Sequence, residues 1–159
     1  MTIRQANSAD APAITRIWNE MIRTTARTFT TAEKTLDGIR EDIERRGARF
    51  QVAELNGDVV GFATYFPFRS GPGYARTQEH SIILSPAAQG QGIGRSLMAT
   101  LEDEARKSGM HSLIAGVSGE NPDGIHFHAA IGYREIARLP EVGYKFDRFM
   151  DLVLMQKFL

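Results

Sequence analysis

The chain has 159 residues, of which 42% are hydrophobic and 24% charged, and this balance excludes a disordered or low-complexity protein. Its 19 Lys and Arg residues are matched by 19 Asp and Glu residues, so it lacks the basic excess of a typical nucleic-acid-binding protein. The absence of Cys excludes a disulfide framework, a thiolate metal site and a covalent acyl-cysteine intermediate. The length predicts one domain, residues 1–159.

Neither a targeting segment nor a membrane span is predicted. Residues 1–10 are too polar for a signal peptide, and no apolar run approaches the roughly 18 residues of a membrane span. We therefore expect a cytoplasmic protein that does not associate with membranes.

Two helices are predicted first. Residues 8–25 have Ser8 or Asp10 as the cap and Pro12 in the first turn, where a missing N–H does little harm. Apolar side chains share one face of this helix: Ile14, Ile17, Trp18, Met21 and Ile22. A second helix is marked by Leu36, Ile39 and Ile43 and is ended by Gly47.

A β-hairpin follows, with strands over residues 50–55 and 59–66 and the turn Asn56-Gly57-Asp58 between them. Residues 67–77 are a loop that contains two prolines and two glycines. A loop of this length is uncommon in a compact domain, which indicates a functional role. Residues 79–84 form the next strand.

The second half of the chain alternates helices and strands. The predicted elements are a Gly-rich turn at 85–94, a helix at 93–108, a strand at 112–117, a short helix at 121–131, and strands at 133–139 and 149–154. The element order is βααβββαβαββ. It predicts a single-domain mixed α/β fold, with a central mixed sheet of about six to seven strands flanked by about four helices.

The sequence Gln89-Gly90-Gln91-Gly92-Ile93-Gly94 lies between a predicted strand and a predicted helix. Glycines let backbone N–H groups approach a ligand, and a helix N-terminus attracts negative charge, so a phosphate group is the expected ligand. No acid occurs in residues 85–101, and Arg95 lies in the first turn. The spacing G-x-G-x-G fits neither the dinucleotide fingerprint nor the P-loop. The alternative is a flexible turn without a ligand.

Gln89, Gly92 and Gly94 resemble the Q/R-x-x-G-x-G/A motif of the GCN5-related N-acetyltransferases. Short motifs along nearly the whole chain resemble the phosphinothricin acetyltransferase-like branch of this family: Ile17-Trp18-Asn19, Thr28-Phe29, Pro67-Phe68-Arg69, Tyr74, Glu79-His80-Ser81-Ile82, Asn121, Phe127-His128, Ile131-Gly132-Tyr133, Val142-Gly143-Tyr144-Lys145-Phe146-Asp147 and Asp151. The resemblance implies acetyl-CoA as co-substrate, its pyrophosphate held by the glycine turn, no metal ion, and a homodimer. The cofactor-binding residues that it implies are Ile82, Ile83, Leu84, Gln89, Gly90, Gln91, Gly92, Ile93, Gly94, Arg95, Ser96 and Asn121.

Glu79 is the candidate general base, because an ammonium group must lose a proton before its nitrogen can attack. Alternation along the strand places Glu79, Ser81 and Ile83 on one face, and His80, Ile82 and Leu84 on the other. A carboxylate with an ordinary pKa is a weak base, so burial or a water chain must assist it. In the resembling family the Glu at this position is proposed as the base, and a bulge in this strand frees backbone N–H groups near Ile83 and Leu84 for the cofactor. The alternative is a surface glutamate at the strand edge.

His128 is the candidate acid for the leaving thiolate, a role implied by the resemblance; a packed, hydrogen-bonded histidine is the alternative. His126 and His128 are two residues apart on a helix, so they point to different faces and do not suggest a metal pair. His111 is interpreted as a surface residue. Asn121 precedes the short helix and is either its cap or, from the resemblance, a contact to the pantetheine arm.

The loop before Glu79 is expected to bind the substrate. An amino-acid substrate presents a carboxylate, which Arg69 can bind through two parallel hydrogen bonds, and Arg76 is its rival on the same loop. The other candidates for substrate binding are Tyr74, Phe29 and Phe68. Phe29 and Phe68 suit apolar walls, although aromatic side chains serve equally well in a core.

The resemblance and these residues together imply an acetyl-CoA-dependent N-acetyltransferase that acetylates the α-amine of a small amino acid or analogue by direct transfer in a ternary complex. The resemblance implies phosphinothricin, methionine sulfoximine or methionine sulfone as the substrate type. One alternative is acetylation of a peptide or protein N-terminus, which a lid formed by residues 67–77 would exclude. The other is an acyl-CoA-binding sensor without turnover, against which an intact Glu79 argues.

Overall fold

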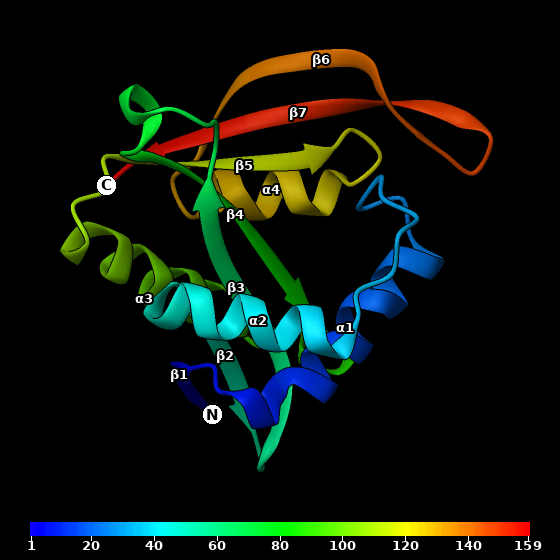
Figure 1. Ribbon diagram of the computed structural model, residues 1–159. Helices are drawn as coiled ribbons and strands as arrows, with labels where there is room; N and C mark the ends of the chain where they lie inside the picture. The colour runs from blue at the N-terminus through cyan, green and yellow to red at the C-terminus, as the bar shows by residue number, and fades with distance from the viewer.

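Seven strands form one sheet in the computed structural model, which describes residues 1–159 (Figure 1). The strands are β1 Thr2–Gln5, β2 Phe50–Leu55, β3 Asp58–Pro67, β4 Thr77–Leu84, β5 Ser112–Ser118, β6 Arg134–Lys145 and β7 Arg148–Phe158. Their order in the sheet is β1-β2-β3-β4-β5-β7-β6. Every neighbouring pair is antiparallel except β4 and β5, which are parallel. The predicted element order and fold class are confirmed.

Four α-helices cover the two faces of this sheet. They are α1 Ala11–Thr24, α2 Leu36–Arg46, α3 Ile93–Lys107 and α4 Pro122–Ala130. Buried residues of α1 and α2 form one core with Phe50, Phe62 and Ile83 of the sheet. Buried residues of α3 form the second core with the opposite face, and α4 packs against that core through Ile125 and Phe127. The sheet therefore separates two apolar layers, one for each helix pair.

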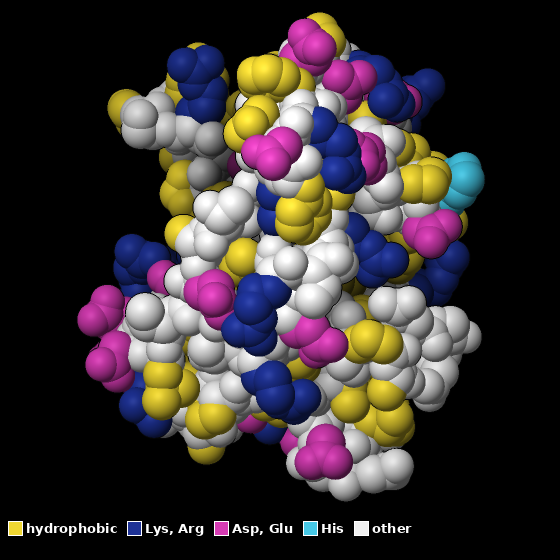
Figure 2. Space-filling model, turned by 90° about the vertical axis from the view of Figure 1, so that its right-hand side faces the viewer, with side chains coloured by type: hydrophobic (Ala, Val, Ile, Leu, Met, Phe, Trp, Pro, Cys, Tyr) yellow, Lys and Arg dark blue, Asp and Glu magenta, His cyan; other side chains and the backbone are white.

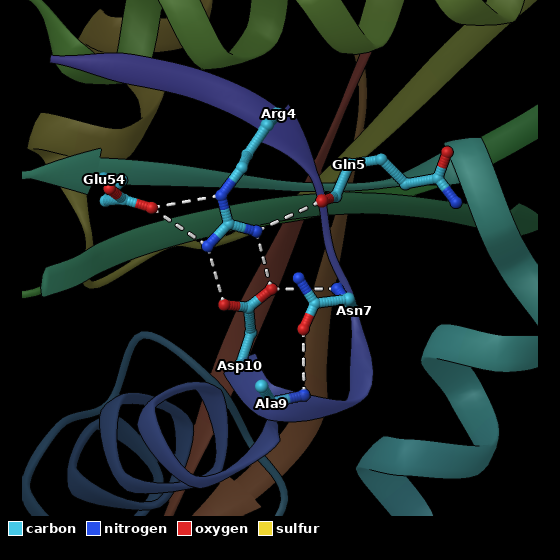
Figure 3. Close-up of polar contacts among 6 residues, drawn as sticks. All are labelled: Arg4, Gln5, Asn7, Ala9, Asp10 and Glu54. Atoms are coloured by element: carbon cyan, nitrogen blue, oxygen red, sulfur yellow. Dashed lines mark hydrogen bonds and ion pairs between the residues drawn. The ribbon is translucent and has the colours of Figure 1, made fainter. Parts of the chain in front are cut away.

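The first strand, to which the sequence assigned no residue range, is held by Arg4. Its guanidinium binds Glu54 of β2 at 3.0 Å and Asp10, at the start of α1, at 2.8 Å (Figure 3). Asp10 is the N-cap residue of α1, as predicted, although its side chain makes no capping hydrogen bond to that helix. A 3-10 turn at Ser8–Asp10 precedes α1 and is capped by Asn7, whose side chain accepts from the N–H of Ala9. Asp10 completes the capping box by accepting from the N–H of Asn7, and Ser8 does not cap.

Three strand boundaries differ from the prediction. Strand β4 begins at Thr77 rather than residue 79, so the loop before it is shorter than expected. Strands β6 and β7 extend well past the predicted 133–139 and 149–154. Pro140 concealed this extension, but β6 is an edge strand, where a proline is tolerated. An irregularity between Leu139 and Gly143 accommodates it.

Candidate active site

The parallel strands β4 and β5 pair over only four residues and then part. Thr77 to His80 pair with Ser112 to Ala115, and the pairing ends there. The register of β4 against β3 continues without a shift to Leu84, so the gap comes from splaying of the strands, and the expected bulge in β4 is absent.

Alternation along β4 determines which of its backbone N–H groups face this gap. The N–H of Ser85 donates to the carbonyl of Val60 on β3 at 2.8 Å. Because antiparallel pairing alternates, the Ile83 backbone is also directed toward β3, whereas the N–H groups of Ile82 and Leu84 face the gap. The N–H of Leu84 therefore faces the gap, as expected, and so does the N–H of Ile82. The N–H of Ile83, also expected to be free, is directed toward β3 instead.

A cavity of about 820 Å³ passes through the sheet at this gap. On the α3 and α4 side it is lined by residues that include Ile82, Leu84, Gln89, Gly90, Asn121 and Phe127. On the α1 and α2 side it is lined by residues that include Trp18, Phe29, Lys34, Arg46, Phe66 and Glu79. We call the first part the cofactor side and the second the acceptor side.

The glycine turn lies at the cofactor side, in front of α3. Gly90 and Gly92 both have φ +75°, and a Cβ at either position would meet no atom within 4 Å. The N-terminus of α3 has no side-chain cap and no acid in its first turn, so its N–H groups are free for an anion. This open helix end, with its partial positive charge, suits a phosphate group.

The other predicted cofactor residues divide into backbone and side-chain positions. Ile93 is buried in the core, so only its backbone faces the turn. A Cβ on Gly94 would lie 3.2 Å from the Phe127 ring, so Gly94 permits close packing of α3 on α4. The side chains of Gln91 and Ser96 bond to Ala87 and Gly92 carbonyls, and the exposed Arg95 reaches the Ala130 carbonyl at 3.4 Å.

Asn121 caps α4 in the way that the sequence suggests. Its side-chain oxygen accepts from the Gly124 N–H at 3.0 Å, while the residue also lines the cavity.

Glu79 reaches the acceptor side with its carboxylate unpaired. The predicted alternation is confirmed, because Ile83 packs with the core of α1 and α2 while His80 contacts His128 of α4 on the other face. Gly116 of β5 makes room for the Glu79 carboxylate, since a Cβ there would lie 3.1 Å from its Oε1. Burial raises the pKa of Glu79 above its usual value. A half-buried carboxylate without a cation suits a general base.

His80 and His128 form a buried pair that the sequence does not reveal, because they are 48 positions apart. The Nδ1 of His128 lies 2.7 Å from the Gly124 carbonyl and must carry a hydrogen, because a carbonyl only accepts. The Nε2 of neutral His128 therefore accepts from the Nε2–H of His80 at 2.9 Å. The Nδ1 of His80 is then the unprotonated nitrogen, in agreement with its lack of any partner. Both ring nitrogens of His128 are engaged, which favours a positioning role over that of an acid.

The predicted substrate residues are only partly brought together. Phe29 lines the acceptor side, and residues 67–77, with Phe68, Arg69, Tyr74 and Arg76, lie outside the cavity lining. Arg69 stacks on the exposed Tyr74 ring at 5.2 Å instead. The lid expected from this loop is therefore not formed, and the segment after α1, residues 25–30, lines the cavity in its place.

Lys145 anchors this segment to the β6–β7 hairpin. Its side chain is buried, and its ammonium donates to the carbonyls of Ile22, Thr25 and Thr28 at 2.6, 2.8 and 3.0 Å. These bonds use all three donors of the group. Nearby, a Cβ on Gly143 would lie 2.4 Å from the Phe29 ring. The hairpin thus fixes the wall that carries Phe29.

Three further features describe the molecule outside the cavity. No group of three or more His, Asp or Glu side chains is arranged to hold a metal ion. No helix is long and apolar enough to span a membrane. On the face shown in Figure 2, basic and acidic side chains are interspersed rather than gathered in a basic patch.

The histidine pair predicts a pH dependence of stability. Burial lowers the pKa of both His80 and His128 below 6.5, so the unfolded chain binds more protons as pH falls below that value. The free energy of unfolding should fall between pH 6.5 and pH 5, with a slope of up to roughly 1.4 kcal/mol per pH unit for each histidine. Urea titrations at several pH values measure the slope. It should become shallower in His80→Gln, which removes one of the two buried histidines.

The raised pKa of Glu79 has the opposite effect on the free energy of unfolding over part of this range. Above pH 4.5 the folded protein binds a proton at Glu79 more readily than the unfolded chain does, so this group adds stability as pH falls. Repeating the titrations in Glu79→Gln separates the two effects. The proteins to compare are then Glu79→Gln and the double variant Glu79→Gln/His80→Gln. Equal slopes for these two proteins would contradict a buried, neutral histidine pair.

Comparison with known proteins identifies the family. The model of the Acetyltransferase (GNAT) family matches residues 14–133. An L-methionine sulfoximine/L-methionine sulfone acetyltransferase from Salmonella typhimurium is 40% identical, over 98% of this chain and 93% of that protein. The L-amino acid N-acyltransferase MnaT from Escherichia coli is 38% identical, over 98% of this chain and 92% of that protein. The solved structure of yncA from Salmonella typhimurium with its cofactor acetyl-CoA has a TM-score of 0.96 and 40% identity, over 100% of this chain and 94% of that chain. The chain therefore belongs to the GNAT family of acetyltransferases and is an N-acetyltransferase that uses acetyl-CoA.

Proposed function

We propose that the protein acetylates the α-amine of a small amino acid analogue of the methionine sulfoximine, methionine sulfone or phosphinothricin type. The observation that carries this proposal is the unpaired Glu79 carboxylate in a cavity that joins the glycine turn to the acceptor side. The relatives named for amino-acid and methionine sulfoximine acetylation match nearly the full chain. A carboxylate poised as a base also argues against a sensor without turnover.

Each part of the site has a separate task in this reaction. Bound acetyl-CoA supplies the activated acetyl group, and Gly90, Gly92 and the N-terminus of α3 hold its pyrophosphate. Glu79 takes a proton from the acceptor's ammonium group, directly or through water, so that the free amine attacks in a ternary complex. The N–H groups of Ile82 and Leu84 stabilise the negative charge that develops on the acetyl oxygen. As the C–N bond forms and the C–S bond breaks, CoA would leave as a thiolate that takes its proton from solvent, while the second proton of the amine passes to water. His128 lies behind this centre, and its hydrogen bonds support positioning rather than proton donation.

Glu79→Gln tests the base. The amide keeps the shape of the side chain but accepts no proton, so kcat near neutral pH should fall by roughly 10²-fold or more. The loss should shrink as pH rises toward the pKa of the amine, because solvent then supplies the free amine. We would measure kcat against pH with thiol release as the readout, and acetyl-CoA affinity by calorimetry, which should not change. Glu44→Gln, an exposed change on α2, is the control. Wild-type kcat in Glu79→Gln across pH 6 to 9 would remove Glu79 from the mechanism.

Gly92→Asp tests the phosphate site. It places a negative charge at the N-terminus of α3, so acetyl-CoA affinity measured by calorimetry should fall by at least about tenfold. Gly109→Asp is the matched control, because Gly109 follows the same helix with φ +79° and equally open space. Gly92→Asn separates charge from backbone strain. Unchanged affinity in a folded Gly92→Asp protein would overturn the phosphate assignment.

We also propose that the protein is a cytoplasmic homodimer. The location is inferred from acetyl-CoA, a co-substrate made inside the cell. Strand β6 has no neighbour on its outer side, and it and β7 expose the apolar side chains of Ile136, Val142, Tyr144 and Phe149. Exposed apolar surface beside an open sheet edge is typical of a protein interface, and a second copy is the commonest partner.

Sedimentation tests the oligomeric state. Wild type should sediment as a dimer, and Val142→Asp/Phe149→Asp should sediment as a monomer, because the charges disfavour burial of this surface. Phe158→Asp, an equally exposed aromatic at the far end of β7, is the control and should remain dimeric. A monomeric wild type would refute the dimer.

A further inference from the structure

The acceptor side of the cavity contains a cation that the reaction does not use. Arg46 lies in the last turn of α2, and its side chain is 13% exposed while still lining the cavity. An arginine buried to this extent is normally paired with an anion.

Arg46 has few partners within the protein. Its Nη1 donates to the Thr64 hydroxyl at 3.1 Å, and this is the one hydrogen bond that its guanidinium makes. Its ion-pair partner is Asp42, one turn earlier on α2, whose Oδ2 lies 3.6 Å from Nη2, beyond hydrogen-bond distance, and whose other oxygen binds Arg45. Since a guanidinium has five N–H donors, four of them have no hydrogen-bond partner within the protein.

A structural task at the helix end does not account for Arg46. The last carbonyls of α2, those of Arg45 and Arg46, accept from the side chain of Arg49 at 3.0 and 3.2 Å. The Arg46 guanidinium instead lies 5.2 Å from the centre of the Phe66 ring, in cation–π contact. Thr64 and Phe66 therefore hold the guanidinium in one orientation at the cavity wall.

The position of Arg46 relative to Glu79 sets the size of what fits between them. Thr64 lies opposite Ser81, and Phe66 lies opposite Glu79, across the β3–β4 pair. Thr64 and Glu79 are thus diagonal neighbours on one face of the sheet, about 7–8 Å apart. An acceptor whose amine lies at Glu79 can place a second polar group at Arg46.

We propose that Arg46, oriented by Thr64 and Phe66, binds an oxygen-bearing anionic or strongly polar group of the acceptor. This inference rests on the proposed function. The two parallel N–H donors of a guanidinium match the paired oxygens of a carboxylate, a phosphinate or a sulfone. On an amino acid analogue, such oxygens occur in the α-carboxylate and at the end of the side chain.

The test compares steady-state kinetics of wild type and Arg46→Met. The KM for phosphinothricin and for methionine sulfone should rise by at least about tenfold, the effect of losing a charge-assisted hydrogen bond. The KM for acetyl-CoA should remain within about twofold. Arg46→Lys should restore part of the affinity, and Arg40→Met, an exposed change on the same helix that does not touch Asp42, should have no effect.

Two further acceptors identify the group that Arg46 binds. If it is the α-carboxylate, Arg46→Met should have no effect on the KM of methionine sulfone amide. If it is the side-chain oxygens, the substitution should have no effect on the KM of methionine. Either pattern supports the inference, whereas an equal rise for every amine, including butylamine, would overturn it.

Calorimetry separates failure of this inference from failure of the proposed function. It measures phosphinothricin binding to the acetyl-CoA-free protein and needs no turnover. Wild type that binds phosphinothricin no better than folded Arg46→Met would overturn the anion subsite, even if both proteins acetylate amines. Wild type that binds it through Arg46 but acetylates none of the acceptors would refute the proposed function alone.

Discussion

The short parallel pairing of β4 with β5 is the constraint on which the rest of the structure depends. Four paired residues tie the strands together, and beyond His80 each is held only by its antiparallel neighbour. The parting opens a passage between two apolar layers that the sheet otherwise separates. It also leaves the N–H groups of the half-buried Ile82 and Leu84 without backbone partners at the cavity wall, where a ligand oxygen can accept from them.

The two sides of the passage are built by different means. The cofactor side uses backbone: φ-positive glycines, a bare helix N-terminus and strand N–H groups, none of which depends on a particular side chain. The acceptor side uses side chains from α1, α2 and the segment after α1, and this segment is fixed by Lys145 of a hairpin more than 100 residues away in sequence. Acceptor specificity can therefore change by substitution while the cofactor site keeps its geometry.

The sequence predicts the backbone part of this design well and the long-range part poorly. Gly90, Gly92 and the following apolar helix lie within one short stretch, and alternation alone places Glu79 and His80 on opposite faces. The pairing of His80 with His128, and the approach of Arg46 to Thr64, join residues that no local pattern connects. Arg69 shows the converse, because its loop is close to Glu79 in sequence but is not part of the cavity lining. The extension of β6 was not predicted, because Pro140 locally indicates the end of a strand.

Burial brings the two proton-exchanging groups of the reaction closer in pKa. It raises the pKa of the Glu79 carboxyl, and it lowers the pKa of any ammonium group that leaves water for the acceptor side, because each charged form loses hydration. The proton transfer between them becomes less unfavourable from both directions. The neighbouring His80–His128 pair is held neutral by the same cause, so it adds no positive charge that would restore Glu79 to its ordinary acidity. The polar partners of Arg46 are Thr64 and Asp42 rather than Glu79, so Arg46 can bind the acceptor's oxygens while the base stays unpaired.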